Sequence, residues 1–151
     1  PAVELLAEVG TARFLARLRQ AGAEIALPKE GAPGLAIGLG GLGVTLTDLT
    51  RLYAGLARGG DPPALVRRLN APPGPTLRPV ADPVAAWYVA DILRGAPPPD
   101  NALSGRIAFK TGTSYGYRDA WAVGFDKRFT VGVWVGRADN GAVPGLVGRA
   151  V

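Results

Sequence analysis

The most restrictive feature of the sequence is a change in the spacing of its apolar residues after Gly105. Before this point apolar residues recur at helical spacing, and after it they alternate with a period of two, as in a β-strand that has two different faces. The alternation predicts strands over residues 106–111, 119–125 and 129–137, with a tight turn at 126–128. Strands in succession with short connections favour an antiparallel sheet.

The two faces of the predicted sheet differ in side-chain size. One set of alternating positions is bulky and comprises Trp121, Val123, Phe125, Phe129, Val131, Val133 and Val135. The opposite set is small apart from Trp134 and comprises Ala120, Ala122, Gly124, Thr130, Gly132 and Gly136. A face of glycine and alanine lets a helix backbone come close, so helices are expected on both sides. The predicted fold class is α+β, an α/β sandwich with an antiparallel sheet flanked by helices.

Helical periodicity dominates the first half of the chain. Residues 2–21 predict two short helices broken at Gly10, with core positions at Leu5, Leu6, Phe14, Leu15 and Leu18. A stronger helix follows Thr45, whose side chain is a suitable cap with Asp48 three residues later, and it stops at Gly59. Its apolar stripe comprises Leu46, Leu49, Leu52, Tyr53 and Leu56.

The last helix before the sheet has clear boundaries. Asp82 is a capping residue, Pro83 suits the first turn, and Gly95 ends the helix. The side chains expected to point inward are Val84, Trp87, Tyr88 and Ile92. Elsewhere glycine and proline predict irregular connections, over 22–44, over 61–81 with a marginal hairpin, and over 97–99.

Several function classes are excluded by composition. The 151 residues include no cysteine and no histidine, which excludes disulfides, thiolate metal sites and catalysis of the papain or chymotrypsin kind. The net charge of +5 comes from single lysines and arginines spread along the chain, so no nucleic-acid partner is expected. No signal peptide or membrane segment is visible, and because the chain opens at Pro1 we expect it to come from a longer protein.

A glycine pattern at residues 38–43 matches the dinucleotide-binding fingerprint G-x-G-x-x-G. Its context does not fit, because the third glycine should open a helix, whereas the next helix is capped by Thr45. Asp61, the candidate for the acidic residue of that fingerprint, follows two glycines in a loop. With 22 glycines in the chain a chance match is common, so nucleotide binding is not expected.

The segment Lys110-Thr111-Gly112-Thr113-Ser114 ends the first predicted strand. A lysine and a threonine hydroxyl at a strand end can hold a carboxylate, and a glycine beside them lets a substrate backbone approach the strand edge. By itself the motif fits a solvent-facing polar strand end better than a binding site. Asp119, which follows an aromatic loop, is expected to be partly buried and bonded to loop backbone, in a structural role.

The residues around this motif resemble the transpeptidase domain of bifunctional penicillin-binding proteins, closest to the 1C type. The similar stretches are residues 109–125, 130–137 and 143–145. Residues 39–60 resemble the helix before the active-site sheet of that family, and Pro1-Ala2-Val3 resembles the residues just after its S-x-N motif. The resemblance covers nearly the whole chain and implies that residues 1–151 are the C-terminal part of a serine β-lactamase/transpeptidase-like fold.

The resemblance also implies a mechanism. In this family the serine of S-x-x-K attacks a D-alanyl-D-alanine carbonyl and passes the acyl group to another stem peptide. It implies that Lys110 is catalytic, in an electrostatic and proton-relay role, and that Thr111, Gly112 and Thr113 bind the substrate or a β-lactam. By the same analogy the backbone N–H of Thr113 is one oxyanion donor.

The sequence departs from the family pattern in its nucleophile. The only serines are Ser104 and Ser114, and neither has a lysine three residues later; S-x-N is also missing. We therefore expect that the first part of the domain and its closing helix lie outside these residues. We further expect that these residues alone are inert towards penicillin and that their uncovered sheet is unstable or associates. The alternative is a non-enzymatic peptide- or glycan-binding module that kept the sheet.

For the parent protein the resemblance implies a peptidoglycan D,D-transpeptidase. Its partners are then peptidoglycan stem peptides and β-lactam antibiotics, and it requires no cofactor or metal. The resemblance further implies a membrane anchor, an N-terminal glycosyltransferase domain and a periplasmic location for this domain.

Overall fold

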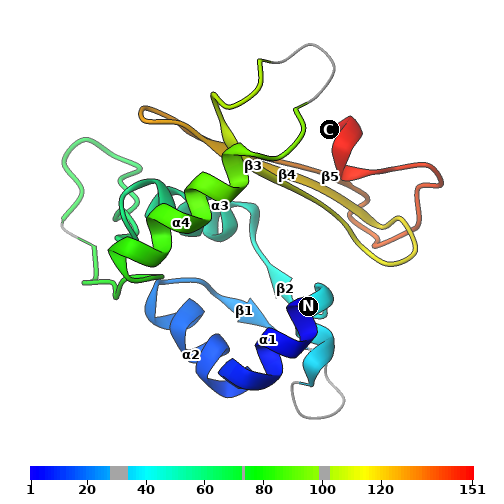
Figure 1. Ribbon diagram of the computed structural model, residues 1–151, viewed down its shortest axis with the longest axis horizontal. Coiled ribbons are helices and arrows are strands. Elements are labelled where there is room, and N and C mark those ends of the chain that lie inside the picture. Colours follow the sequence, from blue (N-terminus) through cyan, green and yellow to red (C-terminus); the bar gives the residue numbers. More distant parts are fainter. Residues whose placement is uncertain (28–33, 73, 99–102) are drawn as a thin grey trace.

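The computed structural model describes residues 1–27, 34–72, 74–98 and 103–151. Its helices are α1 (Ala2–Val9), α2 (Thr11–Gln20), α3 (Leu46–Ala57) and α4 (Pro83–Arg94), with short 3₁₀ turns η1 (Leu35–Leu39) and η2 (Gly148–Ala150). Its strands are β1 (Ile25–Ala26), β2 (Gly43–Val44), β3 (Ala108–Thr113), β4 (Asp119–Phe125) and β5 (Thr130–Gly136). Figure 1 shows α1 and α2 with β1 and β2 at one end of the molecule, the larger sheet at the other, and α3 and α4 between them.

The N-terminal helices form where the sequence predicts them. Gly10 separates α1 from α2 with a φ of 84°, a left-handed value that favours glycine. Leu6 and Leu15 are buried together with Ile37 of η1. Leu5 was expected in this core but is 61% exposed, because it lies about 100° around the helix from Leu6.

Helix α3 is held to the preceding segment by buried charges. The predicted cap is confirmed, since the Thr45 hydroxyl accepts a hydrogen bond from the Asp48 N–H at 3.0 Å. The Asp48 carboxylate is buried, lies 2.6 Å from the Arg51 guanidinium, and accepts from the Glu24 N–H at 3.2 Å. Arg51 also donates to the Gly22 carbonyl. One ion pair therefore fixes α3 against residues 22–24.

Helix α4 begins and ends as predicted but presents the opposite side to the core. Asp82 caps it through the Val84 N–H at 2.9 Å. The residues that point inward are Ala86, which is fully buried, and the half-buried Ala90 and Leu93. The expected inward set is exposed, namely Val84, Trp87, Tyr88 and Ile92. The alanines face the core because α4 packs closely on β3 and α3, and alanine lets the backbones approach.

The larger sheet is antiparallel with β4 between β3 and β5, which confirms the predicted α+β class. The β4–β5 loop consists of Lys127 and Arg128, closed by a bond from the Asp126 N–H to the Phe129 carbonyl at 2.9 Å. This loop is one residue shorter than the predicted turn. The resulting strand register pairs Val123 with Gly132 and Trp121 with Trp134.

The register corrects the predicted faces of the sheet. Paired residues share a face, so each face combines bulky residues of one strand with small residues of the next. The face toward α3 carries Ala108, Lys110, Gly112, Asp119, Trp121, Val123, Phe125, Thr130, Gly132, Trp134 and Gly136. The other face carries Phe109, Thr111, Thr113, Ala120, Ala122, Gly124, Val131, Val133 and Val135.

The two faces are covered to different extents. Gly132 lies directly under α3, where an added Cβ would stand 2.1 Å from the Thr50 hydroxyl oxygen. On the second face the described residues contribute η2, which packs on β3 and β4 near Thr113. Val131, Val133 and Phe129 remain exposed there, beside a hollow of about 460 Å³ with mainly apolar walls.

Two of the predicted connections, 22–44 and 61–81, differ from their predictions in the part of the chain that the structure describes. No strand occurs among the described residues of 61–81, so the marginal hairpin is wrong; Arg78 and Val80 instead donate to the carbonyls of Gln20 and Gly60. In the segment 22–44 the short strands β1 and β2 pair, which was not predicted. Residues 28–33 of that segment, and Pro99 of the predicted loop at 97–99, lie outside the described residues.

The glycine pattern at 38–43 has no dinucleotide-binding geometry. Gly38 lies within η1, Gly40 ends it, and Gly43 lies in β2, so the strand–turn–helix that the fingerprint requires is not formed there. Within the described ranges, no three acidic side chains gather as a metal site. The described helices are also all too short or too polar to cross a membrane.

Candidate functional site

Strand β3 carries the K-T-G segment at the edge of the sheet. It pairs with β4 on one side, and among the described residues no strand pairs with its other side. The strand extends two residues further than predicted and therefore includes Gly112 and Thr113. An exposed strand edge offers backbone N–H and C=O groups to an extended peptide.

Lys110 and Gly112 lie on the α3 face of this edge strand. The Lys110 side chain is exposed, and its ammonium donates to the Thr111 carbonyl. Among the described residues, a Cβ added to Gly112 would meet only the Trp121 Cβ, at an ordinary 3.8 Å. The packing of the described residues therefore does not require a glycine here, and the missing side chain leaves space beside Lys110.

Thr111 and Thr113 point to the opposite face of the sheet from Lys110. The Thr113 hydroxyl accepts a hydrogen bond from the Gly148 N–H at 3.0 Å. An added Cβ at Gly148 would stand 2.3 Å from the Gly112 carbonyl oxygen, so η2 lies directly against the K-T-G backbone. The structure thus brings the four predicted site residues to one strand end but distributes their side chains over two faces.

The loop after β3 is ordered by Ser114. Its hydroxyl oxygen accepts from the N–H groups of Asp119 at 2.8 Å and Arg118 at 3.2 Å. Tyr117 adopts a φ of 56°, an uncommon value for an aromatic residue, and its carbonyl accepts from the Val143 N–H. Ser114 therefore has a structural role in the turn.

Asp119 is half-buried as predicted but has a different partner. Its carboxylate accepts from the Trp134 indole N–H at 2.8 Å, whereas the sequence predicted bonds to loop backbone. The bonds to the loop are made by the Asp119 backbone. Its N–H donates to the Ser114 hydroxyl oxygen, and its carbonyl accepts from the Ser114 N–H. The carboxylate thereby fixes the orientation of an aromatic side chain on the Lys110 face.

An aromatic pair beside the motif was missed by sequence analysis. Trp121 pairs with Gly112 on one side and with Trp134 on the other, and the two indole centroids are 6.3 Å apart. Both side chains lie on the Lys110 face. The signal that could have revealed this pair is the two-residue loop at 127–128, because loop length fixes hairpin register.

Comparison with known proteins was made by sequence and by structure. No family model matches the sequence. The chain is 44% identical over 155 aligned positions to penicillin-binding protein 1C of Escherichia coli strain K12, covering 99% of this chain and 20% of that protein. The chain thus spans about one fifth of the length of this relative.

The fold has a counterpart among solved structures. The penicillin-binding protein PonA1 of Mycobacterium tuberculosis superimposes with a TM-score of 0.61 at 20% identity, covering 98% of this chain and 51% of that chain. At this identity the match supports the fold alone. The sequence match to the Escherichia coli relative is much stronger, and with the shared fold it shows that the chain belongs to the penicillin-binding proteins of the 1C type.

Proposed function

We propose that the chain forms the K-T-G wall of a peptidoglycan D,D-transpeptidase site in a cell-wall enzyme. The observation that supports this most directly is the exposed edge of β3, where Lys110 stands beside a glycine that the packing of the described residues does not require. An extended stem peptide can lie along such an edge and bond to its backbone. The relative named penicillin-binding protein 1C supports the same assignment.

In this proposal each residue has a separate task. The Lys110 ammonium stabilises negative charge and relays a proton, and the Thr111 and Thr113 hydroxyls anchor the terminal carboxylate of the peptide or β-lactam. The backbone N–H of Thr113 contributes to the oxyanion hole. Because η2 already occupies the Thr113 hydroxyl as an acceptor, this hydroxyl remains able to donate its own hydrogen to a carboxylate.

The nucleophile in this proposal comes from outside these residues. Neither serine of the chain precedes a lysine at the required spacing, and Ser114 is engaged with its loop. The 151 residues alone are therefore inert towards penicillin, since an oxyanion hole without a nucleophile cannot be acylated. In the parent protein we place this domain in the periplasm, with a membrane anchor and a glycosyltransferase domain before it.

Covalent labelling by a fluorescent penicillin tests the proposal in the full-length protein that carries this chain. Lys110→Ala should slow labelling by about a hundredfold or more, the usual effect of losing one preorganised electrostatic group. Lys127→Ala, a lysine in the β4–β5 loop, is the matched control and should label like wild type. Absence of labelling in the folded wild-type protein would favour the non-enzymatic binding module instead.

A further inference from the structure

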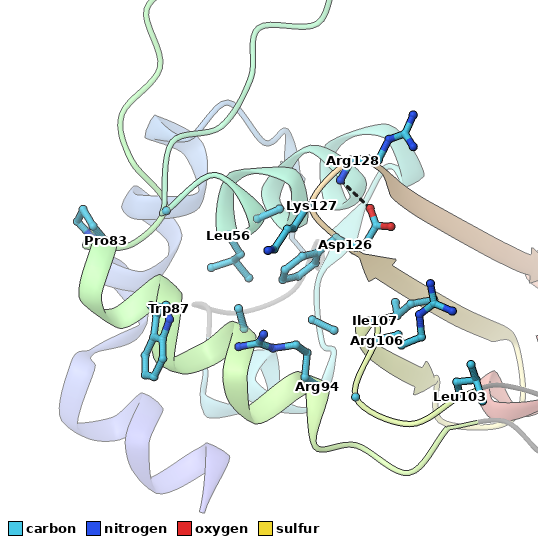
Figure 2. A pocket seen from close by; sticks show the side chains of 16 residues that line it. Leu56, Pro83, Trp87, Arg94, Leu103, Arg106, Ile107, Asp126, Lys127 and Arg128 are labelled. Atoms are coloured by element: carbon cyan, nitrogen blue, oxygen red, sulfur yellow. Dashed lines mark hydrogen bonds between the residues drawn. The ribbon is translucent and has the colours of Figure 1, made fainter.

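The two ends of strand β3 differ in what lies against them. At its start, Ile107 and Ala108 line an open cavity of about 840 Å³ beside α3, α4 and the β4–β5 loop (Figure 2). At its other end the turn η2 packs directly on β3 and β4. The segment that contains η2, residues 143–150, therefore contacts the K-T-G end of the strand.

This C-terminal segment is held beside the sheet at two points. The Val143 N–H donates to the Tyr117 carbonyl at 2.9 Å. The Gly148 N–H donates to the Thr113 hydroxyl oxygen at 3.0 Å. The first bond fixes the start of the segment to the loop after β3, and the second joins η2 to a side chain of the K-T-G segment itself.

Gly148 lies where a side chain would not fit. On the Thr113 face of the sheet, Gly112 and Trp121 present only their backbone, because this pair of residues directs its side chains to the opposite face. A Cβ added to Gly148 would stand 2.3 Å from the Gly112 carbonyl oxygen and 2.7 Å from the Trp121 carbonyl oxygen. The missing side chain therefore lets the Gly148 backbone come close enough to bond to Thr113.

The bond from Gly148 limits the direction of the Thr113 hydroxyl hydrogen. A threonine hydroxyl has one hydrogen to donate and two lone pairs that accept. Gly148 is buried and its N–H uses one lone pair, whereas Thr113 is exposed. The hydroxyl hydrogen must point away from the N–H that its oxygen accepts from, toward the exposed side. A carboxylate on that side would receive a charge-assisted hydrogen bond.

We propose that Gly148 is a positioning residue for the terminal carboxylate of the substrate. Its N–H holds the Thr113 hydroxyl in the orientation in which this hydroxyl donates to the carboxylate. The inference rests on the proposed function, because it takes Thr113 as an anchor of that carboxylate. The preference for a carboxylate then depends on a residue 35 positions after Thr113.

The rate of acylation of the full-length protein that carries this chain tests the inference. Two penicillin probes are compared, one with its free carboxylate and one with that carboxylate as a methyl ester, and the measured quantity is the ratio of their rate constants. Thr113→Val keeps the shape of the side chain and removes the hydroxyl, so it should lower this acid-to-ester ratio about tenfold or more. General damage to the site slows both probes and leaves the ratio unchanged.

Gly148→Ala should lower the acid-to-ester ratio about fivefold or more, because η2 must move away from the Gly112 carbonyl and takes its N–H with it. Gly74→Ala is the control, since an added Cβ there would meet only the Ala64 Cβ among the described residues, at an ordinary 3.7 Å. It should leave the ratio within about twofold of wild type. Combining Gly148→Ala with Thr113→Val should lower the ratio no further than Thr113→Val alone, because both changes act through one hydroxyl.

Thr113→Ser tests the same contact without crowding the backbone, and it decides the question if Gly148→Ala does not fold. Serine lacks the methyl group that restricts rotation about χ1 in threonine. Its hydroxyl therefore keeps its direction only if the Gly148 N–H holds it, and the ratio should then stay within about twofold of wild type. A fall as large as that of Thr113→Val would overturn the inference.

The outcomes separate this inference from the proposed function. A ratio that falls in Thr113→Val but not in Gly148→Ala leaves Thr113 as the anchor and overturns the role of Gly148. A ratio unchanged in both variants, with acylation retained, overturns the inference together with the anchoring role of Thr113, and the transpeptidase assignment stands. Absence of acylation in the folded wild-type protein overturns the proposed function and this inference with it.

Discussion

The two faces of the β3–β4–β5 sheet are both apolar, yet only one is covered by helices among the described residues. On the covered face Val123 is 2% exposed and Gly132 lies against Thr50 of α3. On the other face Val131 is 58% exposed, although it neighbours Gly132 in sequence. Within β5, exposure therefore follows the side of the sheet to which a residue points, since Gly132 is half-buried and Val131 is exposed.

The burial of the covered face depends on how α3 is anchored. Burial of the open face would need contacts that the described residues do not supply. An exposed apolar patch of this kind favours association. The same face includes Thr111 and Thr113 of the proposed site, so its covering bears on function as well as on stability. Substitutions that act on one face at a time measure the difference.

The largest effect is expected from removing the anchor of α3. Asp48→Ala leaves Arg51 buried without its partner and removes the acceptor of the Glu24 N–H, which should cost about 3–5 kcal/mol of unfolding free energy. Urea denaturation followed by tryptophan fluorescence measures it. Asp91→Ala breaks the pair with Arg94 at the same spacing but on the surface, and should cost at most about 1 kcal/mol. Equal costs would contradict the role of burial.

The second-largest loss of unfolding free energy is expected for Gly132→Ala, because the added methyl group overpacks the covered face. The new Cβ would stand 2.1 Å from the Thr50 hydroxyl oxygen, and separating α3 from β5 should cost about 3 kcal/mol. Adding Thr50→Ala should restore part of the stability in a double-mutant cycle. Gly34→Ala is the control, because no atom of the described residues would lie within 4 Å of an added Cβ there. Strictly additive effects in the cycle would show that the contact with Thr50 is not the cause.

A matched valine pair compares the faces directly. Val123→Thr places a hydroxyl in the covered face and should cost about 2 kcal/mol, whereas Val131→Thr on the open face should stay within about 0.5 kcal/mol. Val131→Thr should in addition reduce concentration-dependent association, measured by light scattering. Similar losses of stability in the two variants would mean that the second face is covered in solution.

The smallest effect concerns the turn that sets the register. Hydrogen bonds from the N–H groups of Phe129 and Arg128 hold the pKa of Asp126 below its ordinary value of 3.8. Folding therefore favours the ionised form, and this contribution is present above the ordinary pKa and is lost as pH falls through the lowered one. Asp126→Asn should show a smaller loss of stability between about pH 5 and pH 2 than wild type. Identical pH profiles would exclude this contribution.

Local signals predicted most of the element boundaries. Thr45 and Asp82 each accept the capping hydrogen bond that the sequence indicated, because a cap depends on residues two or three positions away. The inward side of α4 could not be predicted in the same way. Its bulky stripe looked like a core stripe, but close approach to β3 selected Ala86 instead, and that approach is a property of the assembled layers.

The candidate site was predicted in part for the same reason. The motif itself identified Lys110 to Thr113, and the structure places them together at a strand end. The aromatic pair of Trp121 and Trp134 and the bond from Gly148 to Thr113 were not predicted. These contacts join residues that are distant in sequence, and no local pattern specifies them.

The sequence by itself determined helices α1 to α4, strands β3 to β5, the caps of α3 and α4 and the family, because each follows from short-range spacing or from a motif. Only the tertiary structure decided which residues share a face of the sheet. A loop of two residues at Lys127 and Arg128 sets β5 one position away from the register that a three-residue turn would give. Since side chains alternate with a period of two, that single position moves every residue of β5 to the other face.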